Sequence, residues 1–250
     1  MSANTWTPTA LASEFVGWAG SGWRAVEAQH KVATMALVQG SVTAQALLED
    51  ILEDAKPLLP PEVRGLHWLL ATPFRYWPLP GGSRFRRRED PGVFYGAEER
   101  ETACAETGYW RLRFWNESAF LSRQSRSIPL TLFEFHAATE RALDLTRSPL
   151  VADRVLWMNA GDYSATQTLA DNARQASAEI LRYESVRRPS GRCLAILSPE
   201  PFRSVSDPFR NSQQSWNLLI NPPHRLVWQR ELSNECWTFD FVGSAVDFGL

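Results

Sequence analysis

Two stretches of the chain gather side chains that could bind or react with a ligand. The first holds an arginine in a glycine-containing loop (Arg84), a tyrosine after a short apolar run (Tyr95) and a glutamate shortly after it (Glu106), and the second contains Ser185. An arginine guanidinium matches phosphate and carboxylate groups with two parallel hydrogen bonds. These residue types could therefore hold an anionic ligand, although on composition alone a charged surface is the more common explanation.

The elements around these residues determine whether the side chains can meet. Prolines and glycines over 78–82 predict a loop ahead of Arg84. We expect a short strand over 93–95 and then a helix over Glu98–Thr107, which Gly108 ends in the left-handed conformation. This order places the arginine, the tyrosine and the glutamate around one strand–helix junction.

The rest of the chain predicts an α+β fold. Apolar residues recur at helical spacing over Trp23–Val38 and Thr43–Ala55, and Pro57 follows the second segment. A later helix is expected over Thr166–Leu181, and short strands are expected over 130–135, 192–197, 216–220, 225–229 and 236–241. We therefore expect a helical N-terminal extension (1–60) and a mixed α/β body (61–250) that ends in β-rich chain.

Composition and missing motifs narrow the functional classes. The formal net charge of −2 gives no general attraction to nucleic acid or to anionic membranes. The three cysteines lie far apart and the four histidines are scattered, so we expect no metal site and a reducing compartment. P-loop, HExxH, GxSxG and dinucleotide-fold glycine patterns are missing. Without a leader-like start or an apolar run of about 18 residues, we expect a soluble cytoplasmic protein.

The order and spacing of the polar segments resemble the RES family, which is named for its arginine, glutamate and serine. The similar segments are GSRF at 82–85, FYGAEERETACAE at 94–106, TQTLA at 166–170, YESVRRP at 183–189, QSWN at 214–217 and VWQR at 227–230. The resemblance covers about residues 70–242. The chain departs from the family at Cys193, where the family often has asparagine, and residues 1–60 lie outside the family core.

The resemblance implies an ADP-ribosyltransferase-like mixed sheet with flanking helices. It also implies that the chain degrades NAD⁺, its substrate, by hydrolysis or phosphorolysis, without a metal. Carried over position by position, the family's catalytic residues fall on Arg84, Glu106 and Ser185. Arg75 and Tyr95 match family positions that are expected to contact NAD⁺.

Other roles for these residues stay open at this point. Glu106 could form a structural ion pair with Arg84 or Arg111, Ser185 could cap a turn, and Tyr95 could be ordinary core. The tract 86–88 is expected to be a solvated loop rather than a phosphate site.

The resemblance further implies a toxin of a type II toxin–antitoxin pair, with a helix-turn-helix (Xre-type) antitoxin as partner, and it is compatible with a homo-oligomer. Two alternatives remain. One is an ADP-ribosyltransferase that acts on a protein target, and the other is a non-catalytic nucleotide-binding or interaction module. Nucleic acid is not an expected partner, because the charge is nearly neutral and no binding motif is present.

Overall fold

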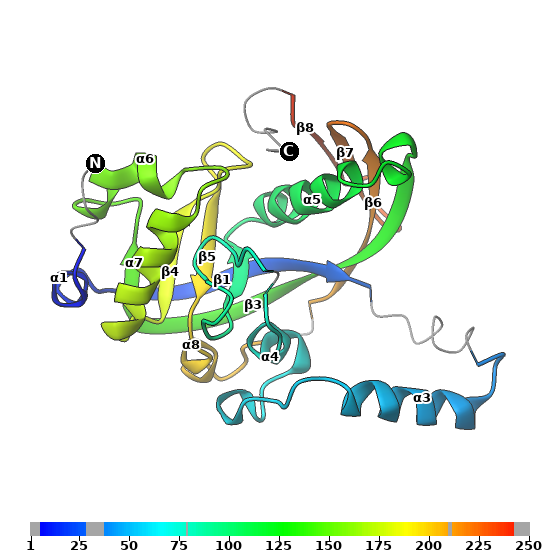
Figure 1. Cartoon of the computed structure of the whole chain (residues 1–250), viewed down its shortest axis with the longest axis horizontal. Helices are drawn as coiled ribbons and strands as arrows, with labels where there is room; N and C mark the ends of the chain where they lie inside the picture. The colour runs from blue at the N-terminus through cyan, green and yellow to red at the C-terminus, as the bar shows by residue number, and fades with distance from the viewer. Residues whose placement is uncertain (1–5, 29–37, 79, 210–211, 243–250) are drawn as a thin grey trace.

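A computed structural model describes residues 6–28, 38–78, 80–209 and 212–242 of the chain. In this part of the chain the strands form one eight-stranded sheet (Figure 1). They are β1 (Val16–Glu27), β2 (Phe94–Ala97), β3 (Arg126–Asp144), β4 (Ile180–Glu184), β5 (Arg192–Ile196), β6 (Gln214–Asn221), β7 (Arg225–Arg230) and β8 (Cys236–Asp240).

The long strand β3 joins two parts of this sheet. The strand order is β1-β2-β5-β4-β3-β6-β7-β8, and β1 also pairs with β3, so the first five strands close into a ring. The start of β3 pairs with β6 and its end pairs with β4. The β3–β4 pairing is parallel, whereas the other pairings among the described strands are antiparallel. The sheet is therefore mixed, as the predicted fold class requires.

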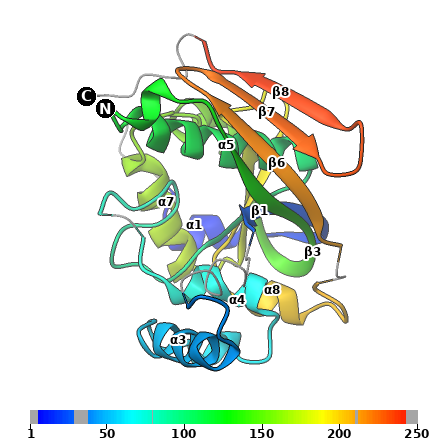
Figure 2. The same cartoon turned by 90° about the vertical axis from the view of Figure 1, so that its right-hand side faces the viewer.

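The helices lie against both sides of the sheet. They are α1 (Pro8–Ala12), α3 (Val42–Asp54), η1 (Pro61–Val63), α4 (Trp68–Arg75), α5 (Arg100–Asn116), η2 (Leu121–Arg123), η3 (Leu150–Asp153), α6 (Arg154–Trp157), α7 (Ser164–Gln175) and α8 (Glu200–Arg203). Leu112 of α5 and Leu169 of α7 belong to one buried cluster, while Leu70 of α4 and Phe202 of α8 belong to another. In both views α3 lies on the side of the molecule away from α5 (Figures 1 and 2).

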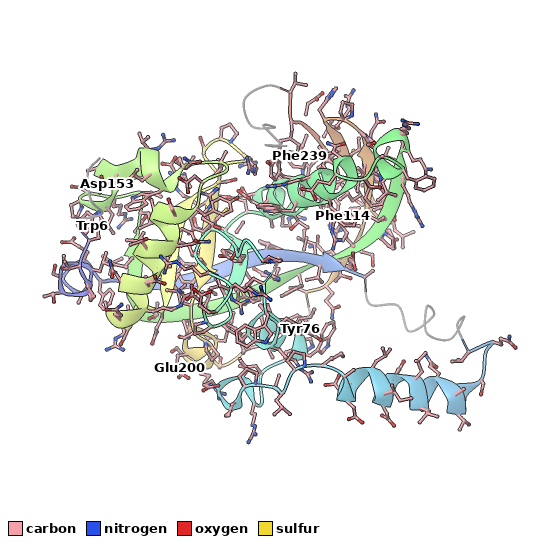
Figure 3. The ribbon with its side chains drawn as sticks, viewed as in Figure 1. Trp6, Tyr76, Phe114, Asp153, Glu200 and Phe239 are labelled. Atoms are coloured by element: carbon pink, nitrogen blue, oxygen red, sulfur yellow. The ribbon has the colours of Figure 1, made fainter. Side chains whose placement is uncertain are left out.

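The start of the described chain is held against α7 and η3. The Trp6 indole donates a hydrogen bond to the Asp153 carboxylate at 2.7 Å, and the two residues lie next to each other in Figure 3. The Asn172 side chain of α7 donates to the Trp6 carbonyl at 2.8 Å. These contacts place α1 beside α7.

Several of the predicted elements are confirmed with small shifts in their bounds. The helix expected over Thr43–Ala55 is α3, with Ser41 as its N-cap. The expected strands correspond to β2, β3, β5, β6, β7 and β8, and β3 is much longer than expected because it pairs with several neighbours.

The prediction of a helix over Trp23–Val38 is wrong for its first part, because residues up to Glu27 form a strand. Residues 29–37 of the predicted helix lie outside the described chain. Residues up to Glu27 belong to β1, which pairs with β3 from Val16↔Ala142 to Glu27↔Leu130. A Cβ at Gly22 would lie 2.4 Å from the Phe135 ring, so this strand needs glycine there. Tertiary pairing thus overrides the helical spacing, and the N-terminal extension is not wholly helical.

Two predicted helix ends are also wrong. Gly108 does not end α5, which continues to Asn116. It allows close packing instead, because a Cβ there would lie 2.6 Å from Leu226 and 3.1 Å from the Trp228 indole nitrogen. The helix expected to reach Leu181 stops at Gln175, and Ser177 at φ 63° turns the chain into β4.

An ion-pair cluster centred on Arg182 connects β4 to the ends of β2 and β3. In β4, Leu181 and Tyr183 face the core cluster that includes α5. Because side chains alternate along a strand, the Arg182 side chain lies on the opposite face. Its guanidinium donates to both Glu98 oxygens at 2.6 and 2.8 Å and to Asp144 at 3.0 Å. Hydrogen bonds to Glu98 are the main cause that raises the pKa of Arg182, so this guanidinium stays charged.

We expect Arg182→Met to lower the free energy of unfolding by about 3 kcal/mol, because it leaves the Glu98 carboxylate without a cation and the buried Asp144 carboxylate with the exposed Arg147 alone. Chemical denaturation measures this loss. The matched control is Arg147→Met: Arg147 also pairs with Asp144, at 3.2 Å, but its side chain is 72% exposed, so its loss should be less than about 1 kcal/mol. Equal small effects of both substitutions would contradict the assigned role.

The same cluster predicts a pH dependence of stability. Burial alone raises the pKa of Glu98 and of Asp144, but the hydrogen bonds and the charge around them outweigh burial, and both pKa values lie below their ordinary values. Depressed pKa values contribute stability that is present above the ordinary carboxyl pKa and is lost as the pH falls through the depressed values. The stability difference between wild type and Arg182→Met should therefore shrink from about pH 7 to about pH 3. Urea unfolding at both pH values tests this, and a constant difference would contradict it.

Candidate functional site

The floor of the candidate site consists of side chains from β2, β5 and β4. Tyr95, Ala195 and Leu181 lie in one row across these strands, and Ala97, Cys193 and Tyr183 lie in the next. All six pack with the cluster that α5 and α7 cover. In Figure 1 the labelled strands β4 and β5 run between α7 and α5.

Glu106 and Ser185 come together over this floor. The Ser185 hydroxyl donates to Glu106 Oε1 at 2.6 Å, and the Cys193 thiol lies 3.8 Å from the same oxygen. α5 carries Glu106 and β4 leads into Ser185, so the contact joins residues 79 positions apart. Within the described residues, the Glu106 carboxylate has no cationic partner, and Arg111 pairs with Glu27 instead. The structural ion pair considered from the sequence is therefore not formed.

The hydrogen-bonding capacity of the Ser185 hydroxyl is fully used. Besides donating to Glu106, its oxygen accepts the backbone N–H groups of Arg187 at 3.1 Å and Arg188 at 3.0 Å. A hydroxyl offers one donor and two acceptor positions. Ser185 is thus both a turn cap and a partner of Glu106, and no position remains for a ligand while these bonds persist.

Tyr95 shapes the loop that carries Arg84. Its hydroxyl hydrogen-bonds the Ser83 hydroxyl at 2.8 Å and accepts the Phe85 backbone N–H at 3.0 Å. Burial raises the pKa of Tyr95, so the phenol keeps its proton. The Gln167 amide of α7 donates to the Ser83 carbonyl at 3.0 Å. The strand tyrosine therefore holds the arginine loop between β2 and α7.

Arg84 reaches from this loop to the segment before α7. Its Nη1 donates to the carbonyls of Trp157 at 2.8 Å and Asn159 at 2.9 Å, and its guanidinium carbon lies 4.8 Å from the centre of the Tyr163 ring. One nitrogen thereby anchors the side chain. The flat guanidinium is held in one orientation before any ligand arrives, which lowers the entropic cost of binding an anion.

The arginines that follow Arg84 differ from one another. Arg86 is 7% exposed and donates to the carbonyls of Asp90 at 3.1 Å and Tyr76 at 2.9 Å. Arg87 forms an ion pair with Asp171 of α7, whereas Arg88 is exposed. The expectation of a solvated loop over 86–88 is therefore wrong for Arg86, which the backbone carbonyls fix in place.

Arg75 does not join the other expected site residues through any contact in the described chain. Its Nε donates to the Pro57 carbonyl and its Nη1 to Glu53, both at 2.5 Å. Arg75 thus fastens the end of α4 to the end of α3. The structure assigns it a role in holding these helices together.

Tyr183, Cys193 and Arg187 are residues of this site that the sequence reasoning did not select. Burial raises the pKa of the Tyr183 hydroxyl well above its ordinary value, and the nearby Glu106 charge raises it further. Arg187 is 7% exposed, and its guanidinium lies 3.5 Å from the centre of the Tyr109 ring. The available signal was strand alternation, which puts Tyr183 on the same face as Ser185.

The loop ahead of Arg84 depends on one of its two glycines. Gly82 has φ +71°, and a Cβ there would lie 2.3 Å from the Arg86 carbonyl oxygen. Ser83 and Arg86 close this turn with paired backbone hydrogen bonds of 2.7 and 3.2 Å. We expect Gly82→Ala to displace Arg84 and to cost about 2 kcal/mol of stability.

Gly81→Ala is the matched control, because a Cβ at Gly81 meets nothing within 4 Å. Thermal unfolding should shift to lower temperature in the Gly82 variant alone. Similar unfolding temperatures of both variants would show that the turn does not need glycine at position 82.

Two further features bear on the kind of site. Among the residues that the structure describes, no group of three or more histidine, cysteine, aspartate or glutamate side chains could hold a metal ion. No helix in the described ranges combines the length and the apolar character needed to cross a membrane.

Comparison with known proteins identifies the family. The model of the RES domain family matches residues 59–221, which is more than half of the chain. A comparison with curated proteins gives no match. One similar solved structure is a chain in the crystal structure of the M. tuberculosis MbcT–MbcA toxin–antitoxin complex, with a TM-score of 0.46 and 12% identity over 88% of this chain and 95% of that chain. On the match to the family model, which spans Arg84, Glu106 and Ser185, the chain belongs to the RES domain family.

Proposed function

We propose that the chain is the toxin of a toxin–antitoxin pair and consumes NAD⁺ by cleaving its nicotinamide–ribose bond. The observation that carries this proposal is the fixed Glu106 carboxylate. Ser185 and Cys193 both contact Oε1, while Oε2 accepts no hydrogen bond from the described residues. One oxygen is thus held by the protein and the other is available to a substrate.

Such a carboxylate suits the reaction. When the bond between the ribose C1′ and the nicotinamide nitrogen breaks, the electron pair leaves with neutral nicotinamide and positive charge develops on the ribose, as in glycoside cleavage. Nicotinamide needs no proton to leave, so a strong general acid is not required. A nearby carboxylate stabilises the developing cation and can orient the attacking water or phosphate.

We propose that Arg84 binds the anionic part of the substrate in the same site. Its Nη1 is anchored on backbone carbonyls, and the rest of the guanidinium can donate charge-assisted hydrogen bonds to a pyrophosphate. Tyr95 holds the backbone beside it. We propose Arg84 as the phosphate-binding residue, Glu106 as the catalytic carboxylate, and Tyr95 and Ser185 as residues that position them.

Incubation of the purified chain with NAD⁺, in the presence and absence of inorganic phosphate, tests the function. Chromatography of the products should show nicotinamide release. ADP-ribose identifies water as the acceptor, a phosphorylated ADP-ribose identifies phosphate, and ADP-ribose attached to protein identifies a transferase. No nicotinamide release under any condition would contradict the proposal.

We propose that the chain acts in the cytoplasm with an Xre-type helix-turn-helix antitoxin, the usual partner of RES toxins. Expression of the chain should arrest growth and deplete cellular NAD⁺, and co-expression of its antitoxin should restore both. Growth arrest without loss of NAD⁺ would contradict the link between toxicity and NAD⁺ cleavage.

A further inference from the structure

Helix α3 presents an apolar stripe to solvent. Five of its apolar residues recur at helical spacing and share one side of the helix: Ala44, Leu47, Leu48, Ile51 and Leu52. A surface helix of a globular protein typically turns such a side toward the core. In α3, however, Leu47 is 61% exposed and Ile51 is 56% exposed, and the only buried residue of the helix is Gln45. The stripe is therefore not used to pack α3 against the described chain.

The place of α3 in the molecule keeps this stripe apart from the candidate site. Arg75 holds the C-terminal end of the helix through Glu53 and the Pro57 carbonyl. The rest of α3 projects along the outside of the molecule, on the side away from α5 (Figures 1 and 2). Leu58, which is 93% exposed, adds another apolar side chain shortly after the helix. A partner could therefore cover this surface without covering Glu106.

Acidic side chains line one edge of the stripe. Asp50 follows Leu47 by three positions, which makes the two side chains neighbours on the helix surface. Asp54 and Ile51 are related in the same way. Both aspartates are exposed, and neither forms an ion pair with another residue of the described chain. The surface thus combines apolar side chains with carboxylates that remain available to a cation.

The acidic residues at the C-terminal end of α3 work against the helix itself. This end of a helix carries partial negative charge and favours cations. The last turn nevertheless contains Glu53 and Asp54 and no basic residue. Lys56 pairs with Glu53 at 2.7 Å, which leaves the charge of Asp54 uncompensated within the described residues. A cationic partner would remove this electrostatic cost.

A second copy of α3 would not supply such a partner. Val42–Asp54 contains four carboxylates and no basic residue, and the opposite edge of the stripe carries Glu49, three positions before Leu52. In a pair of α3 helices, the aspartates of one copy would therefore face carboxylates of the other in either direction, and like charges repel. Nucleic acids and anionic membranes are disfavoured for the same reason.

We propose that α3 is a docking surface for a basic amphipathic helix of a partner protein. The apolar side of that helix covers Leu47 and Ile51, and its lysine or arginine side chains pair with Asp50 and Asp54. Apolar contact provides affinity, and the charges select a basic partner over an acidic one. This surface goes beyond NAD⁺ cleavage and does not depend on it.

Fluorescence anisotropy of two labelled peptides mixed with the full chain tests the docking surface. Each peptide has about 18 residues with leucines at helical spacing, and the other positions are lysine in one peptide and glutamate in the other. We expect the lysine peptide to bind at least about tenfold more tightly, with an affinity that falls as salt is added. Equal affinities, or no binding of the lysine peptide, would overturn the proposal.

Substitutions on α3 locate the binding site. Leu47→Ser/Ile51→Ser should weaken binding of the lysine peptide by at least about tenfold. Asp50→Lys/Asp54→Lys should reverse the preference, so that the glutamate peptide binds more tightly. All four side chains are exposed, so thermal unfolding should stay close to that of wild type. Binding of the lysine peptide that persists unchanged in both variants would overturn the proposal.

Matched controls remove similar groups elsewhere on the surface. Val155→Ser removes a valine that is 83% exposed on α6, and Asp207→Lys/Glu231→Lys makes the same change in net charge at two other exposed positions. Both controls should bind the lysine peptide as wild type does. Loss of binding in either control would show that the peptide recognises net charge or scattered apolar residues, and the proposal would fail.

The other possible occupants are distinguished by two measurements on the chain without peptide. A dimer in light scattering that dissociates in Leu47→Ser/Ile51→Ser would mean that a second copy covers the stripe. Sedimentation with phosphatidylserine vesicles that is lost in the same variant would mean that a membrane does. Either result would overturn the proposal. Nicotinamide release should be the same in wild type and in the α3 variants, so the docking surface and the proposed function stand or fail separately.

Discussion

Glu106→Gln is expected to lower the rate of NAD⁺ cleavage by on the order of 10³-fold while the protein remains folded. Glutamine keeps the size of the side chain and an oxygen that can accept the Ser185 hydroxyl, so the local packing should persist. What it removes is the negative charge beside the developing ribose cation. Since that charge stabilises the transition state more than the bound substrate, kcat should fall and the affinity for NAD⁺ should change little.

The control for this prediction lies on the same helix. Glu117 caps the end of α5 and pairs with Arg113 at 3.0 Å, with its side chain 54% exposed. Glu117→Gln removes the same charge from the protein at a surface position and should leave kcat unchanged. Nicotinamide release, together with thermal unfolding of both variants, measures the contrast. A Glu106→Gln enzyme with wild-type kcat would remove the carboxylate from the proposed reaction.

The resemblance selected four residues that lie in two separate pairs of contacts, and it did not reveal the elements that position them. In the structure Tyr95 contacts the loop that carries Arg84, and Ser185 contacts Glu106. These residues could be selected because the segments that resemble the family keep their order and spacing along the chain. The contacts around them could not be predicted, because they depend on the pairing of distant strands, which a single sequence does not show.

β1 shows why the N-terminal prediction went wrong. The apolar residues at the end of β1 recur at helical spacing, which is why a helix was predicted. These residues form a strand because β1 pairs with β3 over most of its length. The strand also reaches the site, since the Arg24 guanidinium donates to the Tyr95 carbonyl. Burial lowers the pKa of Arg24 to about 10. Part of the support for the site therefore comes from residues before the range that the family model matches.

Arg75 illustrates a different case: the resemblance predicts that it contacts NAD⁺, and in the structure its guanidinium joins the ends of α3 and α4. Its neighbours in sequence are apolar and aromatic, so nothing local distinguishes a ligand-binding arginine from one that holds two helices together. The decisive partners, Glu53 and the Pro57 carbonyl, lie in the N-terminal segment. Long-range contacts of this kind determine which arginines remain available to a ligand.

Ser185→Ala is expected to lower kcat for NAD⁺ by roughly 10²-fold and to leave KM nearly unchanged, because the serine orients Glu106 and does not bind the substrate. All three hydrogen-bonding positions of its hydroxyl are occupied by the protein. A serine that bonded the ribose would instead raise KM when removed. The loss of three hydrogen bonds at a residue that is 4% exposed should also cost about 1–2 kcal/mol of stability.

Ser41→Ala is the control for Ser185→Ala, because it removes a hydroxyl that caps a helix and has no proposed part in catalysis. Ser41 caps α3, where its hydroxyl accepts the Ala44 N–H at 3.3 Å, far from Glu106 in the sequence and on a helix outside the site. This variant should lose stability without losing kcat, whereas Ser185→Ala should lose both. A Ser185→Ala enzyme whose KM rises while kcat stays constant would mean that the hydroxyl leaves Glu106 to bind the substrate. Because Cys193 alone would then hold the carboxylate in wild type as well, Cys193→Ala would lower kcat by the same factor in the wild-type and Ser185→Ala backgrounds.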